Sequence, residues 1–405
     1  MSIKKRQMPS LTGIRFFLAM WVVVYHQTGT DWVWFQQLDL SQPAMSMLRT
    51  GYSAVSLFFI LSGFVLAYNY DLGARWTKRE RLRFVIARFS RIYPAYFLGL
   101  LCVAPLMAYR MTQKLSSGEA GFEAFAGLLN FLLLQSWLPQ TALSWNDPGW
   151  SLSNEAFFYL CFPFLGVLLW RICTPRGFIA GMAGLWVLSL LAPTWAIWRQ
   201  VPGFGDVTAV TTAIEVAANP TVSLWADFVK YNPLIRLAEF GAGILLCRVF
   251  SWLQANGTRL NGRGYWFYLP GLALTLLLTA SAHLIPFPFF HNGLLMPLYL
   301  CIILGFAFSG GLVADWLSNP VVVFLGNASY SMYILHVPIY GWLSILWRRL
   351  LSQETSGPVW QAVYVFVVVA ASALAFKFVE EPMHYWLKRK LNQRLDSSSR
   401  TAVVA

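Results

Sequence analysis

Two ionisable side chains, Arg15 and His26, lie inside the first long apolar run of the chain, LTGIRFFLAMWVVVYH. An ionisable side chain at membrane depth is costly, so it usually faces a polar interior and serves a function. Their spacing is about three helical turns, which places both side chains on one helix face, about 16 Å apart along the axis. The pair predicts one polar path through the membrane, with Arg15 and His26 at two different depths along it. The alternative is a snorkelling arginine at the start of the helix and a histidine at the membrane interface.

A second polar face is predicted for WSLSNEAFFYL. Ser151, Glu155 and Tyr159 follow at i, i+4 and i+8, so they share one side of a helix. We expect Glu155 in the outer third of this helix, at the depth of His26. A histidine and a carboxylate at matched depth can form a hydrogen-bonded pair that fixes the imidazole tautomer and raises its basicity. The alternative role for Glu155 is a favourable charge near a helix N-terminus.

A third polar face is predicted for GNASYSMYILHVPI, where Ser329, Tyr333 and His336 follow at i, i+4 and i+7. Such residues either line a channel or join membrane helices by hydrogen bonds. For His336 we expect one of these two roles rather than direct catalysis. In FILSGF, the pair Ser62 and Gly63 is expected to allow close helix packing.

The loop 75–91 is densely basic and leads directly into RIYPAYF. This density fits either a polyphosphate group bound at the membrane surface or anionic lipid headgroups. Arg88, Arg91 and the adjoining Tyr93 are therefore candidate ligand-binding residues. The sequence contains no Walker loop and no GxGxxG placed between a strand and a helix, so ATP-driven pumping and dinucleotide chemistry have no support.

The elements that must position these residues are membrane helices. The chain is 57% hydrophobic and only 12% charged, whereas a soluble domain carries roughly 25% charged residues. Recurrent apolar stretches predict an all-α, polytopic membrane protein with about ten transmembrane helices and one short re-entrant or interfacial segment at 122–137. The expected spans are 11–29, 53–70, 92–112, 149–170, 178–198, 233–253, 266–285, 290–310, 320–346 and 358–380.

The distribution of basic residues predicts the topology. Counting them on each side places both termini and the loop 75–91 in the cytoplasm and the loop 199–232, with Asp206 and Glu215, outside. The expected organisation is a single transmembrane domain over 1–390 and a cytoplasmic tail over 391–405. Topology and anionic lipid account for the net charge of +13 without nucleic acid. The five cysteines are scattered and predict neither a metal site nor a disulfide framework.

Six motifs occur in one order over nearly the whole chain: Arg15-x10-His26, FILSGF, RIYPAYF, WSLSNEAFFY, GNASYSMYILHVP and FVEEP. As a set they resemble acyltransferase family 3, the bacterial inner-membrane acyltransferases that O-acetylate surface and exported glycans, in its stand-alone form. The resemblance implies acetyl-CoA from the cytoplasm as donor, no permanently bound cofactor, and a carbohydrate acceptor such as an O-antigen or exopolysaccharide.

The residues and the resemblance together predict a mechanism. We expect His26, oriented by Glu155, to act as general base on the acceptor hydroxyl as it attacks the thioester. An acetyl-His26 intermediate is the alternative. The expected residues for binding the donor and substrate are Arg15, Arg88, Arg91, Tyr93, Ser151, Tyr159, Ser329, Tyr333 and His336.

Two other classes of protein remain open at this stage. A proton- or ion-coupled transporter can use Arg15, His26 and Glu155 as a relay, although the sequence lacks the paired broken helices typical of inverted repeats. A membrane scaffold makes no use of so many ionisable groups. The sequence also leaves open a different acyl group, such as succinyl, and a non-glycan acceptor, such as a macrolide.

Overall fold

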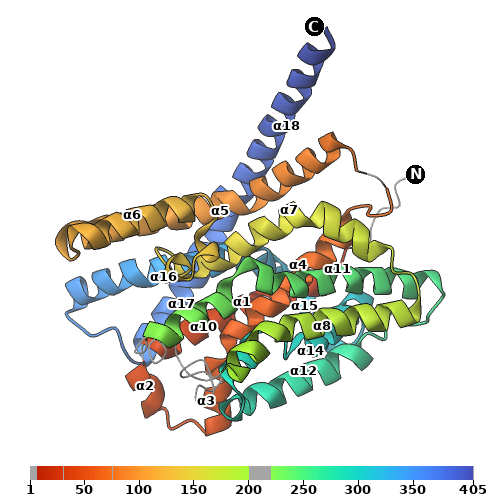
Figure 1. Cartoon of the computed structure of the whole chain (residues 1–405). Helices are drawn as coiled ribbons and strands as arrows, with labels where there is room; N and C mark the ends of the chain where they lie inside the picture. Colours follow the sequence, from red (N-terminus) through yellow and green to blue (C-terminus); the bar gives the residue numbers. More distant parts are fainter. Residues whose placement is uncertain (1–6, 31, 75, 200–219, 405) are drawn as a thin grey trace.

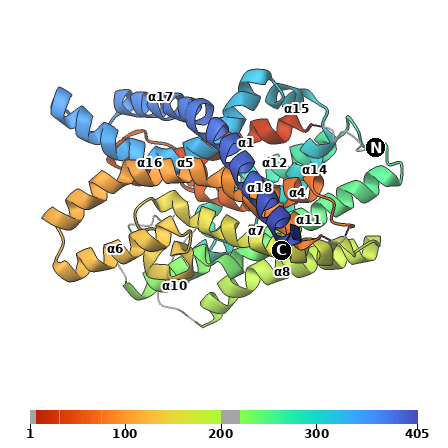
Figure 2. The same ribbon diagram turned by 90° about the horizontal axis from the view of Figure 1, so that it is seen from above.

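The computed structural model describes residues 7–30, 32–74, 76–199 and 220–404. Every regular element within these ranges is helical, which confirms the all-α class. The long helices lie side by side in a bundle, and the last helix projects from it (Figures 1 and 2).

Ten principal helices in the described ranges overlap the ten expected spans. They are α1 (Pro9–Thr30), α4 (Ala54–Asn69), α5 (Lys78–Gln113), α7 (Trp150–Trp170), α8 (Pro175–Trp198), α11 (Pro233–Ala255), α12 (Tyr265–Ala280), α14 (Met296–Phe308), α16 (Pro320–Leu351) and α17 (Pro358–Ala375). The remaining α-helices are α2 (Trp32–Gln37), α3 (Gln42–Arg49), α6 (Ser117–Phe131), α10 (Pro220–Tyr231), α13 (Phe287–His291), α15 (Leu312–Leu317) and α18 (Glu381–Val404). Short turns are η1 (Gly51–Ser53), η2 (Gln135–Trp137), η3 (Pro139–Thr141), η4 (Asp147–Gly149), η5 (Ala282–Leu284) and the π-helical η6 (Phe376–Glu380).

Length and composition of the helices fit a polytopic membrane protein. Seven helical segments among the described residues are long and apolar enough to cross a membrane. Helices α1 and α11 have comparable lengths, 22 and 23 residues, but carry ionisable residues along their course. Helix α12 is a shorter apolar helix.

The helices alternate in direction, which gives the bundle two distinct ends. Contacts such as Ser10 Oγ donating to Phe306 O and Gly262 N–H donating to Phe308 O place the starts of α1 and α12 beside the end of α14. We call this the basic end, because α5 begins here with its cluster of arginines; it lies to the right in Figure 1. We call the other the opposite end; α1, α5, α8, α12 and α16 run toward it, and α4, α7, α11, α14 and α17 return.

Helix α6 occupies the segment expected to be re-entrant. It has 15 residues, about 22 Å of helix, which is too short to cross a membrane. It folds back beside α5 (Figure 1), and η2, η3 and η4 then lead into α7. The side chain of Gln135 donates to Gly149 O within this return.

A proline in α16 explains how this return is anchored inside the bundle. Pro338 has no N–H, so the carbonyl of Ile334, four residues earlier, lacks its usual helical partner. The side-chain amide of Asn146 donates to that carbonyl at 3.1 Å. Helix α7 therefore begins within the bundle and not at its surface.

Two further sequence expectations concern the loop 199–232 and the domain boundary at 390. Most of the loop predicted at 199–232, with Asp206 and Glu215, lies outside the described residues, and the described part forms α10. The predicted domain boundary at 390 falls within α18, which continues through it.

The glycine in FILSGF allows a close contact between two helices, as the sequence indicated. A Cβ on Gly63 of α4 would lie 2.1 Å from Phe240 O, and one on Gly243 of α11 would lie 1.9 Å from Ile60 O. The two backbones therefore touch, which is how small residues stabilise membrane helix pairs. The close-packing interpretation is confirmed for Gly63, whereas Ser62 lines a cavity.

Replacing Gly243 by valine should separate α4 from α11. We expect Gly243→Val to lower the melting temperature of the detergent-solubilised protein, because overpacking costs about 1–3 kcal/mol or more. Gly184→Val in α8 is the control, since nothing lies within 4 Å of its added Cβ. Equal melting temperatures for the two variants would contradict this packing.

Candidate active site

A cavity of about 560 Å³ lies between α1, α4, α5, α7 and α16. Its volume is in the range of small-molecule binding sites. The lining begins at the basic end with Gln7 and Asn69, both exposed, and extends to Ser151 and Tyr333 inside the bundle. The cavity is therefore a blind channel entered from the basic end.

Eight of the eleven residues expected at the site line this cavity. They are Arg15, Arg88, Arg91, Ser151, Glu155, Tyr159, Ser329 and Tyr333. Spacing on shared helix faces therefore predicted which side chains converge, although they come from four different helices.

Arg15 is the cationic group of this cavity without a fixed partner. It forms no hydrogen bond or ion pair with any residue that the structure describes. Arg91, Glu380 and Glu155 act on it only through longer-range electrostatic interactions. A guanidinium in this position presents its donors to whatever enters the cavity.

The two arginines of α5 that line the cavity are held by aromatic and acidic partners. Arg88 Nη2 donates to the hydroxyl of Tyr70 at 3.4 Å, and its guanidinium lies 5.6 Å from that ring centroid. Arg91 forms an ion pair with Glu380, which is fully buried. Ser331 Oγ donates to the other oxygen of Glu380 at 2.6 Å. This arrangement joins RIYPAYF of α5 to FVEEP of η6, and the sequence did not indicate it.

Glu155 has a different partner from the one expected. The hydroxyl of Tyr159 donates to Glu155 Oε2 at 2.8 Å, and the arginines of the cavity act on the same carboxylate. Because α7 begins inside the bundle, Glu155 lies deeper than its position after the loop suggested. It belongs to the level of Arg15 and not to that of His26.

His26 lies beside His336. His336 Nε2 is 3.3 Å from His26 Nδ1, and the ring centroids are 4.8 Å apart. The His336 ring is also 6.3 Å from the ring of Tyr333, which lines the inner end of the cavity. The histidine pair therefore stands just beyond that end. His336 is fully buried, and His26 is half-buried.

The residues around the inner end of the cavity form short polar contacts. Ser151 Oγ donates to Pro148 O at 3.0 Å, and Ser329 Oγ donates to Gly326 O at 2.7 Å. Tyr93 points elsewhere. Its hydroxyl donates to Phe131 O of α6 at 3.2 Å, and its ring stacks on Phe89. Tyr93 therefore supports the re-entrant segment and is not part of the cavity lining.

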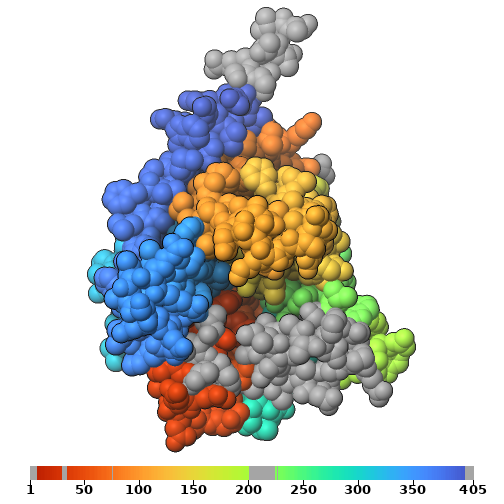
Figure 3. All heavy atoms as spheres, turned by 90° about the vertical axis from the view of Figure 1, so that its left-hand side faces the viewer, coloured from red at the N-terminus to blue at the C-terminus, as the bar shows by residue number. Residues whose placement is uncertain are grey.

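The opposite end of the bundle is hollowed at its centre. Figure 3 views this end and shows a recess between α16 on one side and α5 and α6 on the other, with atoms of the N-terminal helices deeper inside. α1 runs toward this end, with His26 in its last turns. The histidine pair therefore lies toward this end of the bundle, away from the mouth of the cavity.

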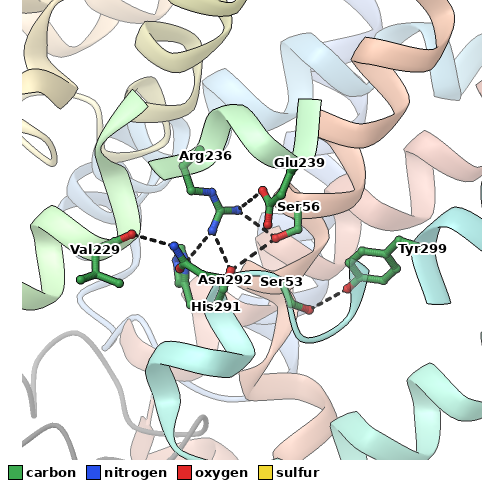
Figure 4. A network of polar contacts seen from close by, with 8 residues as sticks. All are labelled: Ser53, Ser56, Val229, Arg236, Glu239, His291, Asn292 and Tyr299. Carbon is green, nitrogen blue, oxygen red and sulfur yellow. Dashed lines mark hydrogen bonds and ion pairs between the residues drawn. The ribbon is translucent and has the colours of Figure 1, made fainter. Parts of the chain in front are cut away.

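A buried polar network beside the cavity was missed by the sequence analysis (Figure 4). Arg236 pairs with Glu239 at 2.9 Å, and its Nη2 donates to Ser56 Oγ at 2.8 Å. Its Nη1 donates to His291 O at 2.7 Å. Asn292 Nδ2 extends the network to α10 by donating to a backbone carbonyl.

This network has a structural role. Arg236 lies 5.4 Å from the ring centroid of Phe59, which itself lines the cavity. The hydrogen bonds from Arg236 to Ser56 and to His291 O therefore fix α11 against α4 and α13 behind the aromatic wall of the cavity. The rule that singled out Arg15, an ionisable residue inside an apolar run, would have found Arg236 and Glu239 as well.

Comparison with known proteins decides the family. The family model described as an acyltransferase domain matches residues 8–377. The chain belongs to this acyltransferase family. It is a membrane acyltransferase, and the transporter and scaffold alternatives lose their basis.

Several relatives match most of this chain, and the match covers different shares of their own lengths. Acyltransferase MdmB of Streptomyces mycarofaciens is 28% identical over 95% of this chain and 93% of its own length. Peptidoglycan O-acetyltransferase OatA of Listeria monocytogenes is 23% identical over 94% of this chain but only 56% of its own length. A putative O-acetyltransferase of Staphylococcus aureus strain MW2 is 23% identical, and the match covers 59% of that protein. No solved structure matches the chain.

Breaking the ion pair between Arg91 and Glu380 should destabilise the protein. Removal of one partner of a buried pair costs about 3–5 kcal/mol, because the other charge stays buried. We expect Arg91→Gln to lower the melting temperature in detergent, and the double variant Arg91→Gln/Glu380→Gln to recover part of the loss. A double variant less stable than Arg91→Gln would contradict a charge-pairing role.

Proposed function

We propose that this protein transfers an acetyl group from cytoplasmic acetyl-CoA to a hydroxyl of a surface or exported carbohydrate. The observation that carries the proposal is the cavity itself. It is entered from the basic end, is lined by three arginines and ends beside His26 and His336. The acetyl-CoA donor, the carbohydrate acceptor and the catalytic chemistry are the parts of the proposal that go beyond family membership.

The cavity suits an anionic thioester. CoA carries phosphates at one end and a long, largely uncharged arm that ends in sulfur. Arginines bind phosphate through charge-assisted hydrogen bonds, and Arg15 has no partner among the described residues. The apolar lining, which includes Leu11, Val55 and Phe58, accommodates the arm. The acetyl group then reaches the level of Ser151 and Tyr333. Acetyl-CoA is a substrate here, and the reaction requires no permanently bound cofactor.

The chemistry is acyl transfer assisted by a general base. His26 takes the proton of the acceptor hydroxyl while the hydroxyl oxygen attacks the thioester carbonyl. Collapse of the tetrahedral intermediate breaks the carbon–sulfur bond, forms the ester and releases the thiolate of CoA, which takes the proton back from His26. Transfer through acetyl-His26 uses the same residue as nucleophile.

The orientation follows from charge. The basic end carries Arg79, Arg81 and Arg83 in exposed positions, and positive residues remain on the cytoplasmic side. Both termini are then cytoplasmic, and the membrane is the bacterial inner membrane. The acceptor reaches His26 from the recess at the opposite end. Similarity to peptidoglycan O-acetyltransferase OatA supports a carbohydrate acceptor.

Neutralising Arg15 should weaken binding of the donor. A hydrogen bond to a charged group contributes about 1.5–3 kcal/mol, so we expect Arg15→Gln to raise the KM for acetyl-CoA about tenfold or more. Arg110→Gln is a matched control, because Arg110 is half-exposed at the far end of α5. An unchanged KM in Arg15→Gln would remove Arg15 from the donor site.

Removing the imidazole should abolish transfer. We expect His26→Ala to lower the rate by about 10²–10⁴, the usual contribution of a positioned base, with normal expression and melting temperature. The measurement is alkali-labile incorporation of labelled acetyl from acetyl-CoA in membranes that contain the acceptor. Near-normal transfer by His26→Ala would refute the proposed chemistry.

A further inference from the structure

The hydrogen bonds around His336 define which of its nitrogens carries a proton. His336 Nδ1 lies 2.8 Å from the carbonyl oxygen of Tyr333. A carbonyl oxygen only accepts hydrogen bonds, so Nδ1 of the neutral ring must be the protonated nitrogen. Nε2 of His336 therefore carries the lone pair, and it faces His26 at 3.3 Å.

The same argument applies to His26. Its Nδ1 lies 2.9 Å from the carbonyl oxygen of Val22, so Nδ1 carries the proton here too. Within the described residues this N–H lies near two acceptors, the Val22 carbonyl and Nε2 of His336. Nε2 of His26 then carries the lone pair, and it is the nitrogen able to accept a proton.

We propose that His336 is the positioning residue that holds His26 in the tautomer and orientation of a general base. This inference rests on the proposed function and replaces the orienting role that the sequence suggested for Glu155. His336 acts by accepting the hydrogen bond of His26 Nδ1–H. This bond strengthens when His26 becomes cationic, as in other bases that are oriented by a second group.

The surroundings of His336 hold it rigidly enough for this role. The hydroxyl of Tyr364 in α17 donates to the backbone carbonyl of His336 at 3.0 Å. The side-chain amide of Asn146 donates to the Ile334 carbonyl, which Pro338 leaves without a helical partner. Contacts from α17 and from the segment before α7 thus fix this turn of α16, and with it the acceptor presented to His26.

Two substitutions of His336 distinguish its role as a hydrogen-bond acceptor for His26 from its role in filling space. Glutamine places its amide oxygen near the position of Nε2, so it can still accept from His26. Asparagine reaches only the position of Nδ1, so it keeps the contact with Tyr333 O but loses the acceptor. We expect His336→Asn to lower kcat at least tenfold with the KM for acetyl-CoA within twofold of wild type, and His336→Gln to recover a substantial part of kcat.

The kinetic assay is the labelled-acetyl assay with native membranes that contain the acceptor. Glu155→Gln is compared at the same time and should lower kcat less than His336→Asn. Equal kcat values for His336→Asn and His336→Gln, or a wild-type kcat for His336→Asn, would overturn the inference and leave the base role of His26 intact. Near-normal activity in His26→Ala would overturn the base role itself, so the two failures are distinguishable.

A spectroscopic measurement tests the inference in the unsubstituted protein and so does not depend on folding of the variants. The ring ¹⁵N shifts of His26, assigned with His26→Ala in protein labelled at its five histidines, report the tautomer. We expect the form protonated at Nδ1. A His26 ring protonated at Nε2 would overturn the inference.

Discussion

The cost of placing charge within a membrane is the constraint on which this structure depends. An ionisable side chain at that depth needs a partner or a polar cavity. Arg91 is paired with buried Glu380, and Arg236 with buried Glu239. Arg15 has no such partner among the described residues, and it faces the cavity instead. The distribution of partners thus separates arginines that hold helices together from one that is available to an anionic ligand.

The depth at which α7 begins is the second determinant of the site. A helix that started at the membrane surface would place Glu155 near His26. The return after α6 instead runs into the bundle, where Asn146 donates to the carbonyl left open by Pro338. Glu155 is displaced toward Arg15 by this arrangement, and His336 takes the place beside His26. One proline and one asparagine therefore influence which residues meet at the inner end of the cavity.

These relations explain what the sequence could and could not predict. Apolar runs located the ten principal helices, and spacing on helix faces selected eight residues that line one cavity. Partners across helices were harder to predict, because they depend on the relative depth and rotation of elements far apart in the chain. The pairing of His26 with His336 and the support of α6 by Tyr93 are of this kind. The Arg236 network could have been recognised by the rule applied to Arg15.

The central claim is that the cavity delivers the acyl donor from the basic end, which faces the cytoplasm, to an acceptor on the other side. Sidedness of donor use tests this claim most directly. Labelled acetyl-CoA is added to sealed inside-out and right-side-out membrane vesicles that contain the protein and the acceptor, with His26→Ala vesicles as control. The account predicts incorporation of acetyl ester only when acetyl-CoA has access to the cytoplasmic face. Equal incorporation in sealed right-side-out vesicles would contradict it.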